Sequence, residues 1–255
     1  MAMGDERGKN QRAADAANAR EDAREALADA VANGNLDGLR KALPAADLRQ
    51  MGEDGVRPLI SAIFHGHAQC LQELLPHVDR QAIDWESDSG MSLLMQAAAF
   101  NSADVIRALL PFIDARKKAG TGQTALMIAA MCDPRGATGV LQALLPVSDL
   151  LAKDSGGHTA LILASKQGYA GAAEALLAGS NLRDADHQGR TALDHWLAHP
   201  EPRDTEENRM IGKIRELMAL EERAQIEAEL TPAALADGAA EEPGERAVRR
   251  APKAL

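Results

Sequence analysis

The sequence has few aromatic residues and no long apolar run, although almost half of it is apolar. Phe, Trp and Tyr make up 2% of the 255 residues, whereas 51 residues are alanine. Small apolar side chains suit helices that pack closely, and they do not fill a large aromatic-lined pocket. Because no window reaches about 18 consecutive apolar residues, the sequence predicts no membrane span.

Cysteine and positive charge are also scarce. The sequence contains two cysteines, Cys70 and Cys132, which are too few for a disulfide framework and favour a reducing compartment. The formal net charge of −10 disfavours nucleic-acid binding, which depends on Lys and Arg neutralising phosphates. Residues 1–20 lack the apolar core of a secretory signal peptide. We therefore expect a cytoplasmic protein whose partner is neither a membrane nor a nucleic acid.

A repeat of about 33 residues runs through most of the sequence. Each full copy starts with a glycine that is followed four residues later by a leucine, and these glycines are 35, 32, 35 and 32 residues apart. The five glycines are Gly55, Gly90, Gly122, Gly157 and Gly189. A weaker copy precedes them.

Each copy carries the signals of two short helices. Thr124, Thr159 and Thr191 stand at predicted N-caps, where a hydroxyl accepts a hydrogen bond from a first-turn amide. Pro58 takes the predicted first helical position of its copy. A second, amphipathic helix follows, for example over 103–110, and a glycine-containing turn leads to the next copy. Neither helix can bury its apolar stripe alone, so neighbouring copies must stack.

This pattern resembles the ankyrin repeat, whose core reads Gly-x-Thr-Pro-Leu-His-x-Ala-Ala-x-x-Gly-His. Residues 55–67 and 157–168 carry the match most clearly. The resemblance implies an all-α ankyrin repeat solenoid of about five full copies with an N-terminal cap, and it implies a protein-binding function.

The chain departs from the ankyrin pattern after the leucine pair of each copy. Where ankyrin repeats usually carry Gly-Ala-Asp, four copies carry Pro-x-x-Asp, at 44–47, 76–79, 111–114 and 146–149. We expect the proline to stop the second helix and the aspartate to accept hydrogen bonds from amides of the turn.

The sequence predicts one repeat domain between two tails. We place the domain at 23–230, with copies near 23–50, 51–86, 87–118, 119–153, 154–185 and 186–230. Residues 1–22 form either a disordered arm or a frayed helical extension, and residues 231–255 form a flexible tail. Trp196 replaces the usual helix alanine, and we expect it to fill the C-terminal end of the stack beside a capping helix that includes Met210 and Ile211.

The sequence contains few signals of catalysis or metal binding. It has no Gly-rich phosphate loop, nucleophile elbow or paired-cysteine zinc signature. His195 and His199 lie four residues apart beside Asp194, but no third distant zinc ligand is evident. Cys132 has no histidine nearby to activate it, and His67 is expected to make a structural hydrogen bond. We therefore predict that the protein is not an enzyme and has no cofactor or metal.

The resemblance places the binding surface on the concave face made by turn tips and first helices. Carried over position by position, the tip residues are Asp54, Val56, Ser89, Met91, Thr121, Gln123, Gly156, His158, Gln188 and Arg190. The helix residues are Phe64, His65, Ala99, Phe100, Met131, Lys166 and Gln167. Phe64 and Phe100 either form an interface hot spot or cover the core between two copies.

The sequence thus predicts a monomeric, non-enzymatic scaffold that binds a partner protein or peptide. High Ala and Arg usage indicates a bacterial source, and an effector that is delivered into host cells and binds a host protein is the alternative. Two weaker alternatives are a metal-dependent regulator or enzyme that uses His195 and His199, and nucleic-acid binding through the basic segment 246–253.

Overall fold

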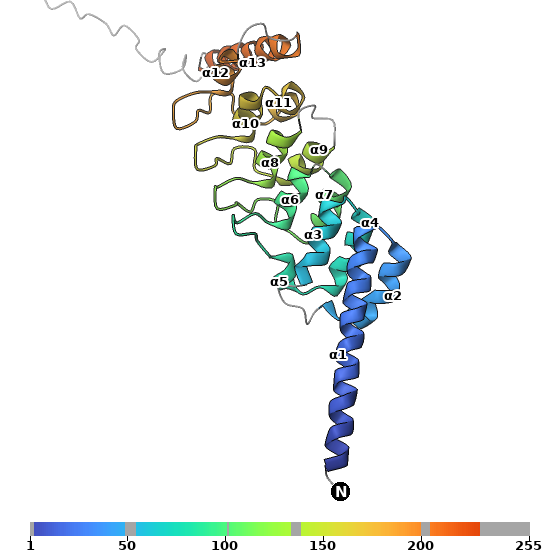
Figure 1. The fold of residues 1–255 in the computed structure, drawn as a ribbon. Helices are drawn as coiled ribbons and strands as arrows, with labels where there is room; N and C mark the ends of the chain where they lie inside the picture. The colour runs from blue at the N-terminus through green and yellow to red at the C-terminus, as the bar shows by residue number, and fades with distance from the viewer. Residues whose placement is uncertain (1–2, 49–54, 101, 134–138, 200–204, 230–255) are drawn as a thin grey trace, which may run out of the picture. The chain divides into compact units, whose positions relative to one another are not determined.

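The computed structural model describes residues 3–48, 55–100, 102–133, 139–199 and 205–229, and this part of the chain contains helices and turns but no strand. The chain divides into two compact units, residues 1–211 and 212–255. The first unit contains the repeats, whose helices pair copy by copy while the turns project on one side (Figure 1). The described part of the second unit, 212–229, is helical.

The first helix of each copy forms one row, which we call the inner row. Helices α1, α3, α6, α8, α10 and α12 contact one another in that order. Their bounds are Met3–Ala32 (α1), Val56–Phe64 (α3), Leu93–Ala99 (α6), Ala125–Cys132 (α8), Ala160–Gln167 (α10) and Ala192–Leu197 (α12).

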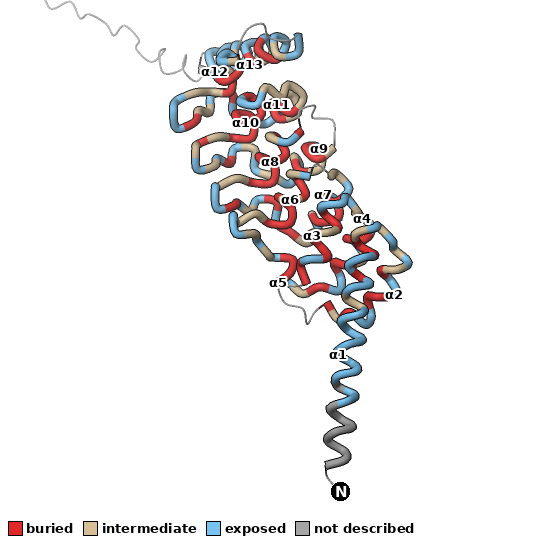
Figure 2. Tube along the Cα trace, viewed as in Figure 1, coloured by how far each residue is buried: buried red, intermediate tan, exposed pale blue. Residues whose placement is uncertain are grey.

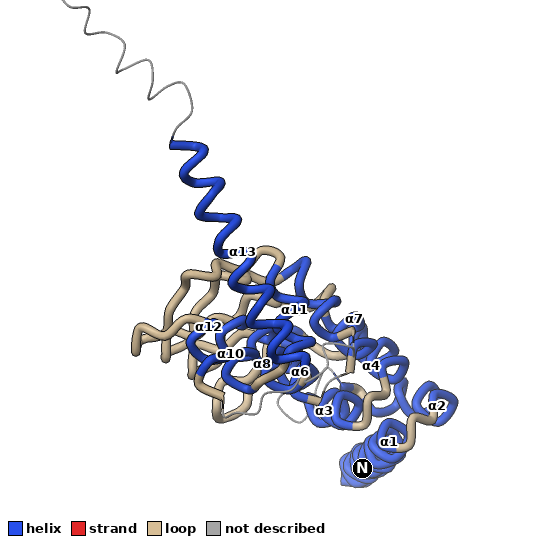
Figure 3. The backbone as a smooth tube through the Cα atoms, turned by 90° about the horizontal axis from the view of Figure 1, so that it is seen from above, coloured by secondary structure: helices blue, strands red, loops and turns tan. Residues whose placement is uncertain are grey.

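The second helices form an outer row that packs on the inner row. These are α2 (Leu36–Ala46), α4 (Ala68–Leu74), α7 (Ala103–Leu109), α9 (Val140–Leu144) and α11 (Ala170–Leu177). The inner row lies between the outer row and the turns (Figure 3), and buried residues gather between the two rows (Figure 2). The predicted all-α stack is confirmed.

Short elements follow two outer helices, and a long helix follows α12. The 3-10 turns η3 (Leu75–His77) and η4 (Leu145–Val147) continue α4 and α9, and a four-residue helix, α5 (Arg80–Ile83), occupies the connection after η3. Helix α13 (Thr205–Glu229) begins in the first unit. No helix of the described part is both long and apolar enough to cross a membrane.

The predicted N-caps are confirmed. The hydroxyl oxygens of Thr124, Thr159 and Thr191 each accept a hydrogen bond at 3.3 Å from the amide three residues ahead, and Ser92 does the same for α6 at 3.4 Å. Pro58 differs from the prediction, because it is the third residue of α3 and not the first. First-turn amides have no partner inside the helix, so proline removes no helical hydrogen bond there.

Proline ends three of the four outer helices that carry a Pro-x-x-Asp segment, as predicted. Helices α4, α7 and α9 each end two residues before a proline, because proline has no N–H to donate to the carbonyl four residues before it and so interrupts the helical hydrogen bonds. For Pro44 the prediction is wrong, since α2 runs through it to Ala46. The left-handed backbone of Asp47, with φ of 48°, ends that helix instead.

The aspartates that follow these prolines hold the turns, as predicted. Asp79 accepts a hydrogen bond from the Ala82 amide at 2.8 Å and caps α5. Asp114 and Asp149 accept bonds from the amides two residues ahead, at 2.9 and 3.0 Å. The Pro-x-x-Asp segments therefore serve the stack.

The residues that flank the repeats on both sides in the sequence are helical. Residues 3–22 continue α1, which is the helical one of the two alternatives for the N-terminal arm, and the side chains of 14–22 are exposed. Trp196 is fully buried, as expected, and Met210 and Ile211 are buried too. Residues 231–255, predicted to be a flexible tail, lie outside the described residues.

Backbone hydrogen bonds join the turn tips of successive copies. The Ser155 amide donates to the Thr121 carbonyl and the His187 amide to the Gly156 carbonyl, both at 3.0 Å. Gly122 lies at such a joint with φ of +77°, and a Cβ there would lie 2.9 Å from the Ser155 nitrogen. Glycine is required at this position by both backbone conformation and space.

We predict that Gly122→Ala destabilises the stack more than Gly189→Ala. Gly189 has nearly the same φ, +75°, but a Cβ there meets nothing within 4 Å. The control should lose about 1–2 kcal/mol for left-handed strain alone, whereas alanine at Gly122 also displaces the next turn. Free energies of unfolding from urea titrations measure both, and equal losses would contradict the crowding at Gly122.

Candidate functional site: the inner-helix face

An exposed aromatic pair lies where the first two full copies meet. Phe64 is the last residue of α3 and Phe100 directly follows α6. They are 59% and 46% exposed, although their ring centroids are 5.0 Å apart in an edge-to-face arrangement. His65 packs edge-on against Phe64 at 5.1 Å. These contacts orient the rings without burying them, so the alternative that both rings cover the core is wrong.

The inner row carries very little charge around this pair. Among the 24 residues of α3, α6 and α8, Arg57 alone is charged. Met131, near the end of α8, is partly exposed and continues the apolar surface into the third copy. The next charge along the row is Lys166, in the last turn of α10. We call the exposed surface from α1 to α10 along this row the inner-helix face.

Most of the predicted binding residues lie on the surface. The exposed ones are Phe64, His65, Ser89, Phe100, Thr121, Lys166, Gln167 and Gln188, and the partly exposed ones are Met91, Ala99, Gln123, Met131, Gly156, His158 and Arg190. Val56 is a correction, because it is 4% exposed as the first residue of α3 and so cannot take part in a surface. Asp54 lies outside the described residues.

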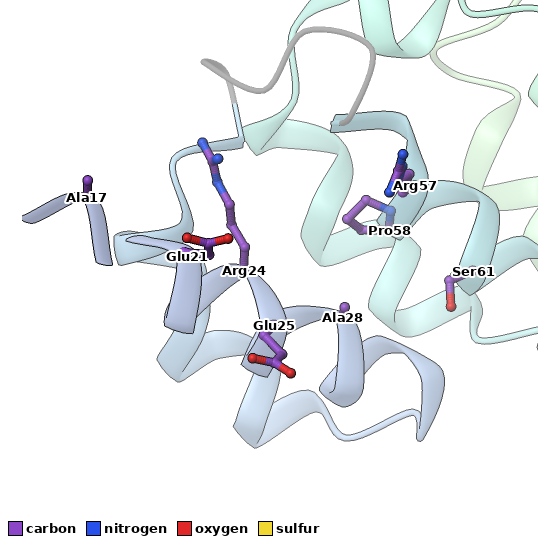
Figure 4. Close-up of a pocket in the computed structure, with 8 residues that line it drawn as sticks. All are labelled: Ala17, Glu21, Arg24, Glu25, Ala28, Arg57, Pro58 and Ser61. Atoms are coloured by element: carbon purple, nitrogen blue, oxygen red, sulfur yellow. The ribbon is translucent and has the colours of Figure 1, made fainter. Parts of the chain in front are cut away.

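A groove between α1 and α3 extends the inner-helix face towards the N-terminus (Figure 4). Its volume is about 940 Å³, and its lining residues are Ala17, Glu21, Arg24, Glu25, Ala28, Arg57, Pro58 and Ser61. Arg24 is tied to the end of α2, because its Nε donates to the Ala46 carbonyl at 3.1 Å. Ser61 lies one turn before Phe64 in α3, so the groove leads towards the aromatic pair.

This groove was not predictable from the repeat, because α1 lies mostly outside the repeat pattern. The available signal was Glu21 and Glu25, which are four residues apart and therefore share one side of a helix. Nothing in the sequence showed that this side meets α3.

The turns of the last two copies contain a buried ionic network instead of a ligand site. Asp186 is 6% exposed and accepts hydrogen bonds at 2.9 Å from the amides of Gln188 and Arg190 and from Nε2 of His195. Burial alone would raise the pKa of Asp186, but these donors and the Arg190 charge outweigh it, and its pKa lies well below the ordinary value. Arg190, a predicted tip residue, is therefore engaged inside the protein.

Burial also determines the protonation state of His195. It lowers the pKa of His195 below the ordinary value and outweighs the opposing effect of Asp186. The imidazole is thus neutral near pH 7 and donates its Nε2 proton to Asp186. His158, another predicted tip residue, contacts Asp154 through Nδ1 at 3.1 Å. These contacts hold the turns of the last two copies in place.

The three side chains considered as zinc ligands, His195, His199 and Asp194, are engaged in other contacts. His195 bonds to Asp186, His199 donates from Nε2 to the Ser165 carbonyl at 2.9 Å, and Asp194 accepts a bond from the Thr191 amide at 2.8 Å. Among the described residues, no three potential ligands lie together as a metal site.

The remaining candidates for chemistry are also structural. Burial raises the pKa of the Cys70 and Cys132 thiols, so neither is an activated thiolate. His67 contacts the Ala32 carbonyl of the preceding copy through Nε2 at 3.2 Å, which confirms the predicted structural hydrogen bond.

We predict that acid destabilises the stack through His195. The unfolded chain protonates this histidine near pH 6.5, whereas the folded chain does so at lower pH, so stability falls as pH drops below about 6.5. Asp186 adds a loss below about pH 4, because its folded pKa is also depressed. His195→Gln keeps an N–H donor but does not titrate, so its stability should change less between about pH 7.5 and about pH 5.

Urea denaturation across this pH range tests the prediction. Thr159→Ala is the control, because it removes an N-cap hydroxyl without removing a titrating group. It should lower stability and keep the wild-type pH dependence. If His195→Gln keeps that dependence as well, the assignment to His195 is wrong.

Stacked helix pairs with an open inner-helix face define the molecule as a solenoid repeat protein. The family model described as Ankyrin repeats (3 copies) matches residues 27–119 and 78–154, which together span half of the chain. The chain belongs to the ankyrin repeat family. No curated protein matches it. Ankyrin repeats are generally protein–protein interaction modules, and proteins built from them are typically non-enzymatic binding scaffolds.

Proposed function

We propose that this protein binds a partner protein or peptide on its inner-helix face, at the concave side of the stack. The supporting observation is the exposed pair Phe64 and Phe100. Aromatic side chains are enriched among the residues that dominate interface energies. The uncharged surface of α6 and α8 beside the pair costs little to desolvate when a partner covers it.

The stack supports this function because it holds the face in one shape before the partner arrives. The hydrogen bonds between turn tips and the edge-to-face contact of the two rings restrict the surface in the free protein. A preorganised surface loses less conformational entropy on binding, so more of the contact energy becomes affinity. In the turn of the last copy, Asp186 is paired with Arg190 and His195, which favours a structural role for these groups over a catalytic one.

We predict that the double variant Phe64→Ala/Phe100→Ala loses its partners. Truncating interface aromatics costs about 1–2 kcal/mol each or more, so the affinity should fall at least about 30-fold for the pair. Affinity capture from lysate, with the wild-type chain and the variant in parallel, measures this loss. Because both rings are exposed, the variant should remain folded by circular dichroism.

Val147→Ala/Leu151→Ala is a matched control. These residues are 39% and 54% exposed but belong to the turn region after α9, away from the inner row. This variant should retain the partners. Retention by both double variants would remove the binding surface from the inner-helix face.

A further inference from the structure

The two ends of the inner-helix face carry free charges of opposite sign. At the α1 end, Glu21 and Glu25 are exposed on the groove wall. At the α10 end, Lys166 is exposed in the last helical turn. Within the described part of the chain, none of these three side chains has a hydrogen-bond or ionic partner.

The other charges near the face are already engaged. The Arg24 guanidinium donates to the Ala46 carbonyl, and Arg57, on the opposite wall of the groove, makes contacts within the chain. Both arginines keep their positive charge but already have partners, so the described charged groups of the face without a partner are the two carboxylates at the α1 end and the ammonium at the α10 end. The surface between them offers Phe64, Phe100 and Met131.

The spacing of the helices sets the length of a segment that fits. Four steps of about 8–10 Å separate α1 from α10, which gives about 32–40 Å, and an extended chain covers about 3.3 Å per residue. A segment of about 10–12 residues therefore spans the face. Phe64 and Phe100 lie one and two steps from α1. The middle of the aromatic pair is therefore about four residues of extended peptide from the carboxylates and about seven from Lys166.

We propose that the bound segment of the partner is an extended peptide with a basic end, an apolar anchor and an acidic end, in that spatial order. Its basic end faces Glu21 and Glu25, its anchor covers Phe64 and Phe100, and its acidic end faces Lys166. This inference rests on the proposed function. The anchor supplies most of the affinity, whereas the exposed charges set the direction of the peptide and change Kd by up to about fivefold each.

A displayed library of random peptides about 14 residues long tests this order directly. The full chain should enrich peptides that carry Lys or Arg, then an aromatic or large aliphatic residue about four residues on, then Asp or Glu about seven residues further. The reverse order along the peptide satisfies the proposal equally, because it describes the same placement with the opposite chain direction.

Two charge-reversed variants and one control sharpen the test. Glu21→Lys/Glu25→Lys should select acidic residues in place of the basic end, and Lys166→Glu should select basic residues in place of the acidic end. Lys41→Glu reverses an exposed lysine on the outer helix α2 and should enrich the same peptides as the wild type.

The outcomes separate this inference from the proposed function. Some peptides could require Phe64 and Phe100 for binding but show no fixed order of charges, or bind the charge-reversed variants unchanged. Either result overturns the inference and leaves the proposed function in place. Peptides that bind Phe64→Ala/Phe100→Ala as well as the wild type overturn both. A library that yields no enriched peptide overturns the inference, and the capture experiment then decides the function.

Discussion

The structure depends on one constraint, which is that no helix of a copy can bury its apolar side without a neighbour. The inner helices are 6–9 residues long after α1, too short to be stable alone in water. Their stability therefore comes from packing, and alanine at the contact positions lets neighbouring helices approach closely. Ala62, Ala97, Ala129 and Ala164 are all fully buried at the same place in successive copies. An alanine-rich stack leaves little room for an enclosed pocket, which supports the proposal that a partner binds on an open face.

The organisation of the stack was readable from the sequence because it is periodic. The caps at Thr124, Thr159 and Thr191 and the turns at Asp79, Asp114 and Asp149 recur at fixed offsets and depend on local hydrogen bonds. Features that do not recur in every copy were harder to predict from the sequence. Pro44 looks like a helix stop but lies inside α2, and Val56 looks like a turn tip but is the buried start of α3. In both cases packing between helices overrides a preference of one or two residues.

The candidate site was only partly predictable, for a related reason. The aromatic pair could be found because both rings fall at matching positions of the repeat, but their exposure required coordinates. The groove of Glu21 and Glu25 joins a helix outside the repeat pattern to α3. The contact of His195 with Asp186 joins residues from a helix and the turn before it. Sequence spacing does not reveal which such groups meet, because the path of the intervening turn decides it.

The distribution of charge links stability to function. Ion pairs between described residues join successive copies away from the inner-helix face, and they include Arg40–Glu73, Lys117–Glu86, Lys153–Asp184 and Arg209–Glu174. Such exposed pairs add little stability individually, but they neutralise charge where copies meet on the outer row and at the turns. The inner helices α3, α6 and α8 contain one charged residue, Arg57, and therefore have almost no charge to neutralise. The net charge of −10 therefore lies mainly on other surfaces and leaves one nearly uncharged, aromatic-bearing strip over α3, α6 and α8. Because uncharged surface costs little to desolvate, this strip supports the proposed contact with a partner.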